Sequence, residues 1–218
     1  MEPGKISSGD RRSWLETQAG TATVWASPPI SALVAAASSS MKKLLSLFLL
    51  SAAGLLAQPA TVDLGSRGQV TLYFAEGWRA AMTDMGGQAT VNVTPTGDAN
   101  ANCTLLITTP EQDRFDTKAR LKLRVEADGQ PVAEGSVEGK AIGREFSLTA
   151  GFGFYCNFTD AEMKGKPPQK GNYKVMSSGK IRLAPDVMID VTIMADDFKG
   201  QAYQQLLGAI EGMEYKRR

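Results

Sequence analysis

The segment VMIDVTIM, at residues 187–194, is the most strand-like run of the chain and decides its fold. Every odd position from Val187 to Ile193 holds a branched apolar residue, whereas Asp190 and Thr192 occupy even positions. Strict alternation is typical of a strand with one buried and one exposed face. The segment therefore predicts a sheet strand whose odd residues face the core and whose even residues face the other way.

An amphipathic helix is predicted directly after this strand. Asp196 or Asp197 can begin the helix, and the basic end at 216–218 is typical of a helix C-terminus. A single apolar stripe indicates a helix that packs on a sheet. The stripe consists of Ala202, Tyr203, Leu206, Leu207, Ile210 and Met213.

Short alternating segments separated by turn residues fill much of residues 69–183. Those before residue 110 follow one another closely, which predicts an antiparallel meander. After residue 144 the pattern resumes and includes a hairpin that reverses at Ser178-Gly179. The predicted strands are 69–74, 78–85, 89–94, 102–108, 145–149, 152–158, 172–177 and 180–183.

Residues 115–128 carry two competing patterns. Apolar and charged residues alternate from Ala119 to Ala127, which indicates a strand. Opposite charges also recur four residues apart, which indicates a helix that Asp113 or Asp116 caps and Gly129 ends. The pattern alone leaves both interpretations open. The charge pairs are Asp116–Arg120, Lys122–Glu126 and Arg124–Asp128.

The order of these elements resembles the PsbP-like proteins, over most of residues 69–215. The features that match are the Gly77-Trp78 turn, the segment 155–160, the Lys/Gly/Tyr hairpin at 171–174, strand 187–194 and the final helix. The resemblance implies an α/β/α sandwich and places a helix at 115–128. The expected class is α+β, an antiparallel sheet of about six to eight strands with a mid-chain and a C-terminal helix packed on it. The alternatives are a curved helix-grip sheet and, third, a β-sandwich.

The N-terminal quarter predicts export. Residues 41–57 combine Met41 and two lysines with a short apolar run, as in a secretory signal peptide. Cleavage is expected after Ala57, with Ala60 as the alternative, leaving residues 58–218 as a single periplasmic or extracellular domain without a stable membrane span. Residues 1–40 are interpreted as a disordered leader that arises from a start assigned too early, with a twin-arginine-like segment at 11–15 as the competing explanation.

Composition excludes several kinds of chemistry. The chain has no histidine, which removes serine–histidine and cysteine–histidine catalysis and the commonest metal ligand. Its 24 basic and 23 acidic residues nearly balance, so no nucleic-acid partner is expected. No nucleotide-binding or metal-spaced motif is present, and no cofactor or metal is expected.

The two cysteines, Cys103 and Cys156, each lie inside an apolar run. Export and their even number favour a structural disulfide between them on neighbouring strands. The alternative is a pair of unpaired buried thiols.

The resemblance implies an accessory module rather than a catalyst, and no metal-binding residue is carried over from the family. We therefore expect a non-catalytic protein-interaction module of the bacterial cell envelope. An exposed loop at 161–171 with Tyr173 beside it is the expected docking region, through Lys164, Lys166, Lys170 and Tyr173. The alternatives are a carrier of a small apolar ligand in a cavity lined by Tyr203 and Leu207, and an enzyme that uses carboxylates such as Asp160 or Asp190.

Overall fold

The computed structural model of the chain describes residues 58–84, 88–110 and 115–218. The predicted leader and signal peptide, residues 1–40 and 41–57, lie outside the described residues. The first described residue already belongs to a strand, β1 (Gln58–Asp63), which is not among the strands predicted from the sequence.

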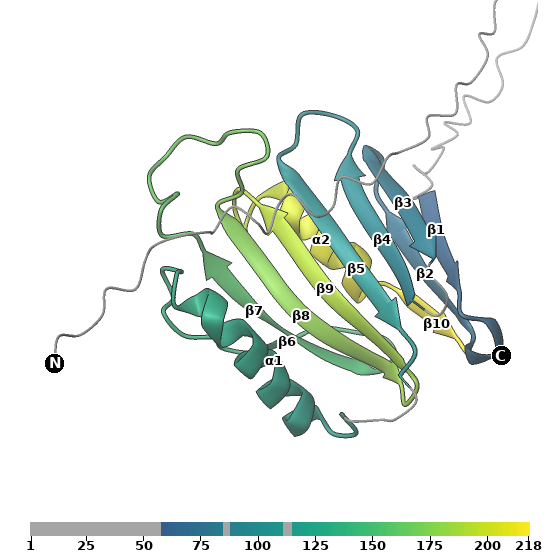
Figure 1. The fold of residues 1–218 in the computed structure, drawn as a ribbon. Helices are drawn as coiled ribbons and strands as arrows, with labels where there is room; N and C mark the ends of the chain where they lie inside the picture. The colour runs from purple at the N-terminus through teal and green to yellow at the C-terminus, as the bar shows by residue number, and fades with distance from the viewer. Residues whose placement is uncertain (1–57, 85–87, 111–114) are drawn as a thin grey trace, which may run out of the picture. The chain divides into compact units, whose positions relative to one another are not determined.

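Seven antiparallel strands form the main sheet, in the order β3-β4-β5-β9-β8-β7-β6 (Figure 1). Three of the four strands of the predicted meander form β3 to β5, whereas the first, at 69–74, belongs to a second sheet and is therefore wrongly placed by the prediction. The strand at 187–194 forms β9 in the middle of the main sheet. The predicted strand at 145–149 is wrong beyond Glu145, because β6 has only 2 residues. The bounds are β3 Trp78–Asp84, β4 Gln88–Pro95, β5 Ala101–Thr108, β6 Arg144–Glu145, β7 Phe152–Thr159, β8 Val175–Ala184 and β9 Val187–Ala195.

The predicted hairpin at Ser178-Gly179 is also wrong, because β8 runs through it as one continuous strand. Gly179 is needed for close packing and not for a turn. A Cβ atom there would lie 2.5 Å from the Phe154 carbonyl oxygen and 2.7 Å from the Tyr155 Cβ on the neighbouring strand. The chain reverses later, between β8 and β9 at Pro185-Asp186.

Helix α1 (Lys118–Ala133) packs on one face of the main sheet, mainly over β7 and β8. Leu121 and Val125 are buried against Phe154, Cys156 and Phe158 of β7. The helix prediction for 115–128 is therefore confirmed. All three predicted charge pairs form: Asp116–Arg120, Lys122–Glu126 and Arg124–Asp128.

Both predicted ends of this helix are wrong. Thr117 is the N-cap, and its side chain accepts a hydrogen bond from the Arg120 amide; Asp113 lies outside the described residues. The helix continues through Gly129 and Pro131 to Ala133. Gly129 faces β7, where a Cβ atom would lie 2.9 Å from Phe158 Cζ. The glycine is therefore a point of close approach between helix and sheet.

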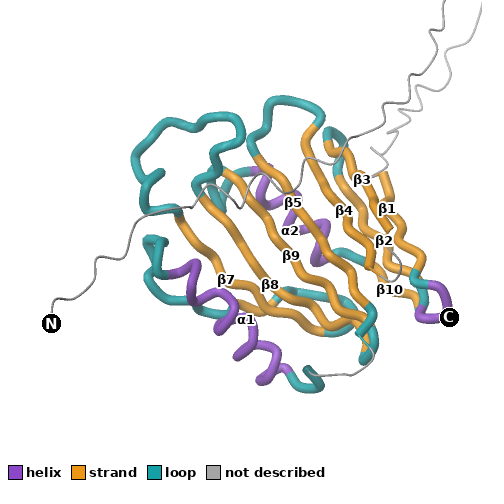
Figure 2. The backbone as a smooth tube through the Cα atoms, in the orientation of Figure 1, coloured by secondary structure: helices purple, strands orange, loops and turns teal. Residues whose placement is uncertain are grey.

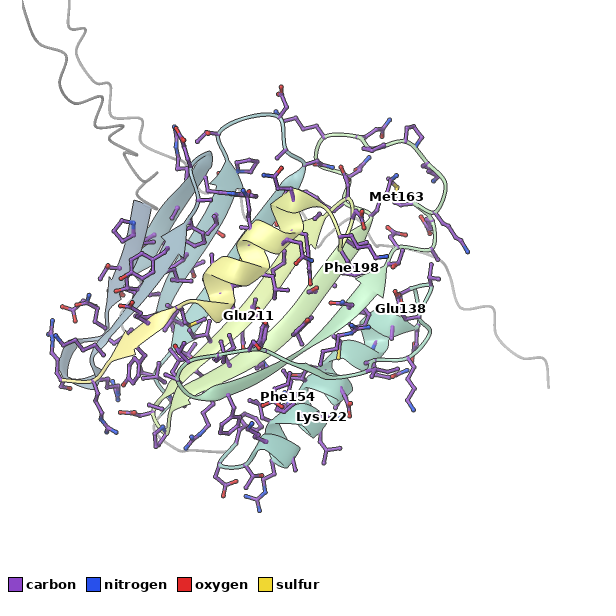
Figure 3. All side chains as sticks on the ribbon, turned by 180° about the vertical axis from the view of Figure 1, so that it is seen from behind. Lys122, Glu138, Phe154, Met163, Phe198 and Glu211 are labelled. Carbon is purple, nitrogen blue, oxygen red and sulfur yellow. The ribbon has the colours of Figure 1, made fainter. Side chains whose placement is uncertain are left out.

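Helix α2 (Gln201–Glu211) packs on the opposite face, and Figure 3 shows it lying across the strands between Phe198 and Glu211. Its buried residues Tyr203, Leu206 and Ile210 belong to the larger core, which includes the odd residues of β9. It begins after an N-cap at Gly200, later than the predicted start at Asp196 or Asp197.

A second antiparallel sheet, in the order β1-β2-β10, packs beside α2. It contains β1, β2 (Gln69–Phe74) and β10 (Glu214–Lys216), and a 3-10 helix, η1 (Gly65–Arg67), joins the first two strands. The basic C-terminus is therefore not the end of a helix, because α2 ends at Glu211 and the chain continues as β10. With helices on both faces of the main sheet, the described domain is an α+β fold with α/β/α layers, as predicted.

Candidate interaction surface

Strands β3, β4, β5 and β9 leave one side of the main sheet without a helix over it (Figure 1). Residues paired directly across a sheet share a face, so the register identifies this side. Thr108 pairs with Met188 and Met194 pairs with Met176, and both Met188 and Met176 pack with α1. The surface is therefore a continuation of the α1 face, and we call it the open face.

The open face is mostly polar and uncharged. It consists of Arg79, Ala81 and Thr83 of β3, Thr90, Asn92 and Thr94 of β4, Asn102, Thr104, Leu106 and Thr108 of β5, and Asp190, Thr192 and Met194 of β9. None of these residues is buried. In contrast, Val91, Leu105 and Ile193, on the other side of the same strands, are 0% exposed. One row runs from Ala81 through Asn92, Thr104 and Thr192 to Ser178.

Hydrogen bonds hold some of these side chains in place. In the middle of the row, the Thr104 hydroxyl donates to Asn92 Oδ1 at 3.1 Å. At one end of the face, Asn102 Nδ2 donates to the Tyr173 hydroxyl at 3.1 Å. The Asn102 Oδ1 atom is buried and has no hydrogen-bond partner in the described part of the chain. The face therefore offers ordered donors and acceptors with few charges.

The β7–β8 loop, residues 160–174, borders the open face at the end where Tyr173 contacts Asn102. Asn100, in the β4–β5 loop, ties this loop down through three hydrogen bonds and makes a fourth to Asp196 (both loops are at the same end of the sheet in Figure 2). Its Nδ2 donates to the carbonyls of Gln169 and Asn172 and to Asp196 Oδ1, and its Oδ1 accepts from the Gly171 amide, at distances of 2.8 to 3.2 Å.

The predicted docking residues in this loop form two groups, which differ in how exposed their side chains are. Lys164, Lys166 and Lys170 are exposed, and no ion pair is found for them within the described ranges. Tyr173 is half-buried against Asn102 and therefore links the loop to the open face. The structure thus places the predicted residues beside a surface that the sequence interpretation missed. The Thr and Asn residues at alternate strand positions were a visible signal for that surface.

A small cleft of about 220 Å³ lies where α1 meets the open face. Lys180 lies in it, with its ammonium 2.8 Å from Asp190 Oδ1 and 3.5 Å from Asp128 Oδ2. Arg124 also binds Asp128, at 2.9 Å. Asp190 therefore faces outward, as expected for an even position, and both carboxylates have a cationic partner.

Asp160, the other carboxylate considered for catalysis, is exposed and accepts a hydrogen bond from the Glu162 amide. It lies at the end of β7, outside the cleft that contains Asp190. The structure therefore does not bring the two carboxylates together.

The space beneath α2 is filled by side chains. The Tyr203 hydroxyl lies 2.6 Å from Ser177 Oγ, which donates to Asn157 Oδ1 at 2.6 Å. Burial raises the pKa of Tyr203 to about 12. Where the carrier alternative places an apolar cavity, the described residues around Tyr203 therefore form packed core and a buried hydrogen-bond network.

A larger cleft of about 520 Å³ lies beside the start of α2 instead. Its lining is mixed: Glu76, Asp98, Gln201 and Gln205 are polar, whereas Trp78, Pro95 and Ala202 are apolar. The Trp78 indole donates to Gln205 Oε1 at 3.0 Å. This lining differs from the apolar cavity that a carrier of small apolar ligands would need.

The predicted disulfide between Cys103 and Cys156 is wrong, because both are free thiols. Cys103 is in the core on the α2 side of β5, and Cys156 is in the core on the α1 side of β7. Strands β9 and β8 separate them, which is roughly 14 Å at the usual strand spacing and too far for a disulfide. Burial raises the pKa of Cys103 to about 12 and that of Cys156 to about 11, so both thiols are unreactive.

Comparison with known proteins adds no family. No family model matches the chain, and a search of curated proteins finds no match. In the described part of the chain, no three cysteine, aspartate or glutamate side chains gather as a metal-ligand set. None of the helices described there is long and apolar enough to cross a membrane.

Proposed function

We propose that this chain is a non-catalytic accessory module, exported to the cell envelope, that binds a protein partner through the open face and the β7–β8 loop. The observation that carries the proposal is the open face: a helix-free surface of four neighbouring strands, lined by ordered hydroxyl and amide groups. Such a surface can dock another protein through hydrogen bonds, whereas its few charges give it no evident catalytic chemistry.

The loop determines the chemistry expected of the partner. Three exposed lysines, Lys164, Lys166 and Lys170, border a nearly uncharged face. A partner with neutral polar groups over the strands and acidic side chains over the loop would complement both parts. Charges at the rim of an interface chiefly raise the association rate and make it depend on salt.

Export rests on the apolar segment at 41–57, and the residues of β1 (Gln58–Asp63) bear on the two cleavage sites considered. Cleavage after Ala57 leaves β1 whole, whereas cleavage after Ala60 removes half of the strand. Ala60 pairs with Leu72 and is 4% exposed, so its loss would open the core of the small sheet. The α/β/α layer order also supports the PsbP-like assignment that we propose for this chain.

The test is affinity purification of the tagged protein from its own cell envelope, followed by binding measurements with the partner recovered. Lys164, Lys166 and Lys170 are changed together to Glu, and Lys140, Lys199 and Lys216, which are exposed elsewhere, form the control triple. Both triples change the net charge equally. We expect the loop triple to weaken binding about tenfold or more, mainly through slower association, and the control triple to change it little.

A second pair of variants tests the strands. Thr94→Lys places a long charged side chain on the open face, and Thr61→Lys places one on an exposed position of β1. Loss of binding in the first variant alone supports the proposal. Equal binding by all variants, a co-purified apolar ligand, or turnover abolished by Asp160→Asn or Asp190→Asn would overturn it.

A further inference from the structure

The smaller and the larger cleft differ in how their carboxylates are balanced. In the smaller cleft, Lys180 binds both Asp128 and Asp190. The larger cleft, beside the start of α2, is lined by Glu76 and Asp98 and by no lysine or arginine. Within the described ranges, neither of these two carboxylates has an ion pair or a hydrogen bond. The larger cleft therefore carries two negative charges without a cation of its own.

The floor of the larger cleft is apolar. Trp78 is the only buried residue of its lining; it is 7% exposed and belongs to the larger core, whereas Glu76 and Asp98 are exposed. The indole therefore forms the floor, and the carboxylates lie at the rim. A ligand that fills the cleft needs an apolar part for the floor and a positive charge for the rim.

The chain segments that form the cleft are tied to one another. The Thr96 amide donates to the Gly77 carbonyl at 2.8 Å, which joins the β4–β5 loop to the turn before β3. The Trp78 indole donates to Gln205 Oε1 at 3.0 Å, which joins β3 to α2. The volume of about 520 Å³ is typical of small-molecule sites. Because the walls are held in place before a ligand arrives, binding costs less ordering.

The start of α2 opposes a cation by less than the carboxylates favour one. The N-terminus of a helix is equivalent to about half a positive charge, and α2 begins at the cleft with Gln201. Glu76 and Asp98 together supply two negative charges. The balance in the cleft is therefore negative, which favours a cationic ligand and opposes an anionic one.

We propose that the larger cleft binds a ligand in which an ammonium or guanidinium group is joined to a short aliphatic chain. The aliphatic chain packs on Trp78, and the cationic group binds Glu76 and Asp98. A free amine and a basic side chain of another protein share this chemistry. The cleft lies on the α2 side of the main sheet, away from the open face, so this site does not depend on the proposed function.

Pentylamine and two analogues of equal length test the chemistry. The full chain has 3 tryptophans, and the changes Trp14→Phe and Trp25→Phe leave Trp78 as the only one. Its fluorescence and its indole N–H signal then report on the cleft. Pentylamine should change both signals saturably at millimolar concentration. Pentanol, which lacks the charge, and pentanoate, which reverses it, should bind about tenfold more weakly.

A pair of double variants tests the carboxylates. Glu76→Gln/Asp98→Asn removes both charges from exposed positions and leaves the floor unchanged. We expect it to weaken pentylamine binding about tenfold and to remove most of the dependence of that binding on salt. The control, Glu134→Gln/Glu162→Gln, changes the net charge equally at exposed positions outside the cleft and should bind as the unchanged chain does.

A lysine-containing tripeptide and the diamine cadaverine identify the source of the cation. Tighter binding of the tripeptide than of its Nε-acetylated form identifies a protein side chain, and tighter binding of cadaverine than of the tripeptide identifies a free amine; either result supports the proposal. Equal binding of pentylamine, pentanol and pentanoate, unchanged binding by Glu76→Gln/Asp98→Asn, or constant Trp78 signals at every concentration would overturn it.

Discussion

Gly129 and Gly208 both lie inside helices, and the structure predicts that replacing each by alanine will change stability in opposite directions. Gly208, in α2, is exposed, and a Cβ atom there would meet nothing within 4 Å. Gly129, in α1, is buried, and a Cβ atom there would lie 2.9 Å from Phe158 Cζ and 3.2 Å from Ala141 Cβ.

The magnitudes follow from these contacts. Alanine is favoured over glycine inside a helix by about 1 kcal/mol, so Gly208→Ala should raise the free energy of unfolding by about that amount. Gly129→Ala gains the same helix preference, but overpacking the α1–β7 contact costs about 1–3 kcal/mol. We expect a net loss of about 1 kcal/mol, and the two variants should therefore melt roughly 4–8 °C apart.

Thermal and urea unfolding monitored by circular dichroism measure both free energies. The variant Gly129→Ala/Phe158→Leu removes the ring atom that the new methyl group meets, so the two changes should cost less together than the sum of their separate effects. The reasoning is refuted if Gly129→Ala is as stable as Gly208→Ala, because α1 would then not approach β7 as closely as described.

Three further predictions concern polar contacts. Tyr203→Phe should lower the free energy of unfolding by about 1 kcal/mol. The stability of this variant should also depend less on pH above pH 10 than that of the natural protein. The pKa of this tyrosine rises from 10.0 in the unfolded chain to about 12 in the folded one. The stabilisation by its hydroxyl is therefore complete below pH 10 and is lost as the pH rises towards 12. Urea denaturation of both proteins between about pH 9 and 12 measures this difference. Asn100→Ala should speed amide exchange and proteolysis in the β7–β8 loop while the fold persists. The control, Thr96→Ala, changes another residue of the β4–β5 loop and should leave both rates unchanged. Equal protection of the β7–β8 loop in the two variants would contradict the anchoring role of Asn100. Asp190→Asn should change the unfolding free energy by at most about 1 kcal/mol, because its ion pair with Lys180 is partly exposed, and a much larger loss would indicate a deeper role.

The strands were predictable wherever alternation reflects burial on one side only. β2, β4, β5 and β9 follow this rule, because the buried residues of each alternate along the strand and face the larger core. β8 was misread because glycine normally marks a turn, whereas Gly179 is required by the nearness of Phe154 and Tyr155 on β7. That requirement is a tertiary contact, so no local pattern could reveal it.

The candidate surface was predictable only in part. The lysines of the 161–171 loop and the polar positions of β4 and β5 are visible in the sequence. Which strands α1 covers depends on where it packs, and this decides that Asn92 and Thr104 stay accessible. The disulfide prediction failed for a related reason, because compartment and cysteine number do not say which face of the sheet Cys103 and Cys156 occupy.

The position of these two thiols has a practical consequence for following the motions of the fold. Each core layer contains one cysteine, and a thiol reagent can reach Cys103 only when the α2 layer opens and Cys156 only when the α1 layer opens. The α1 core is the smaller of the two, so α1 should detach more often, and Cys156 should be labelled first. The natural chain therefore contains a pair of probes that can time the opening of its two layers separately, without any substitution.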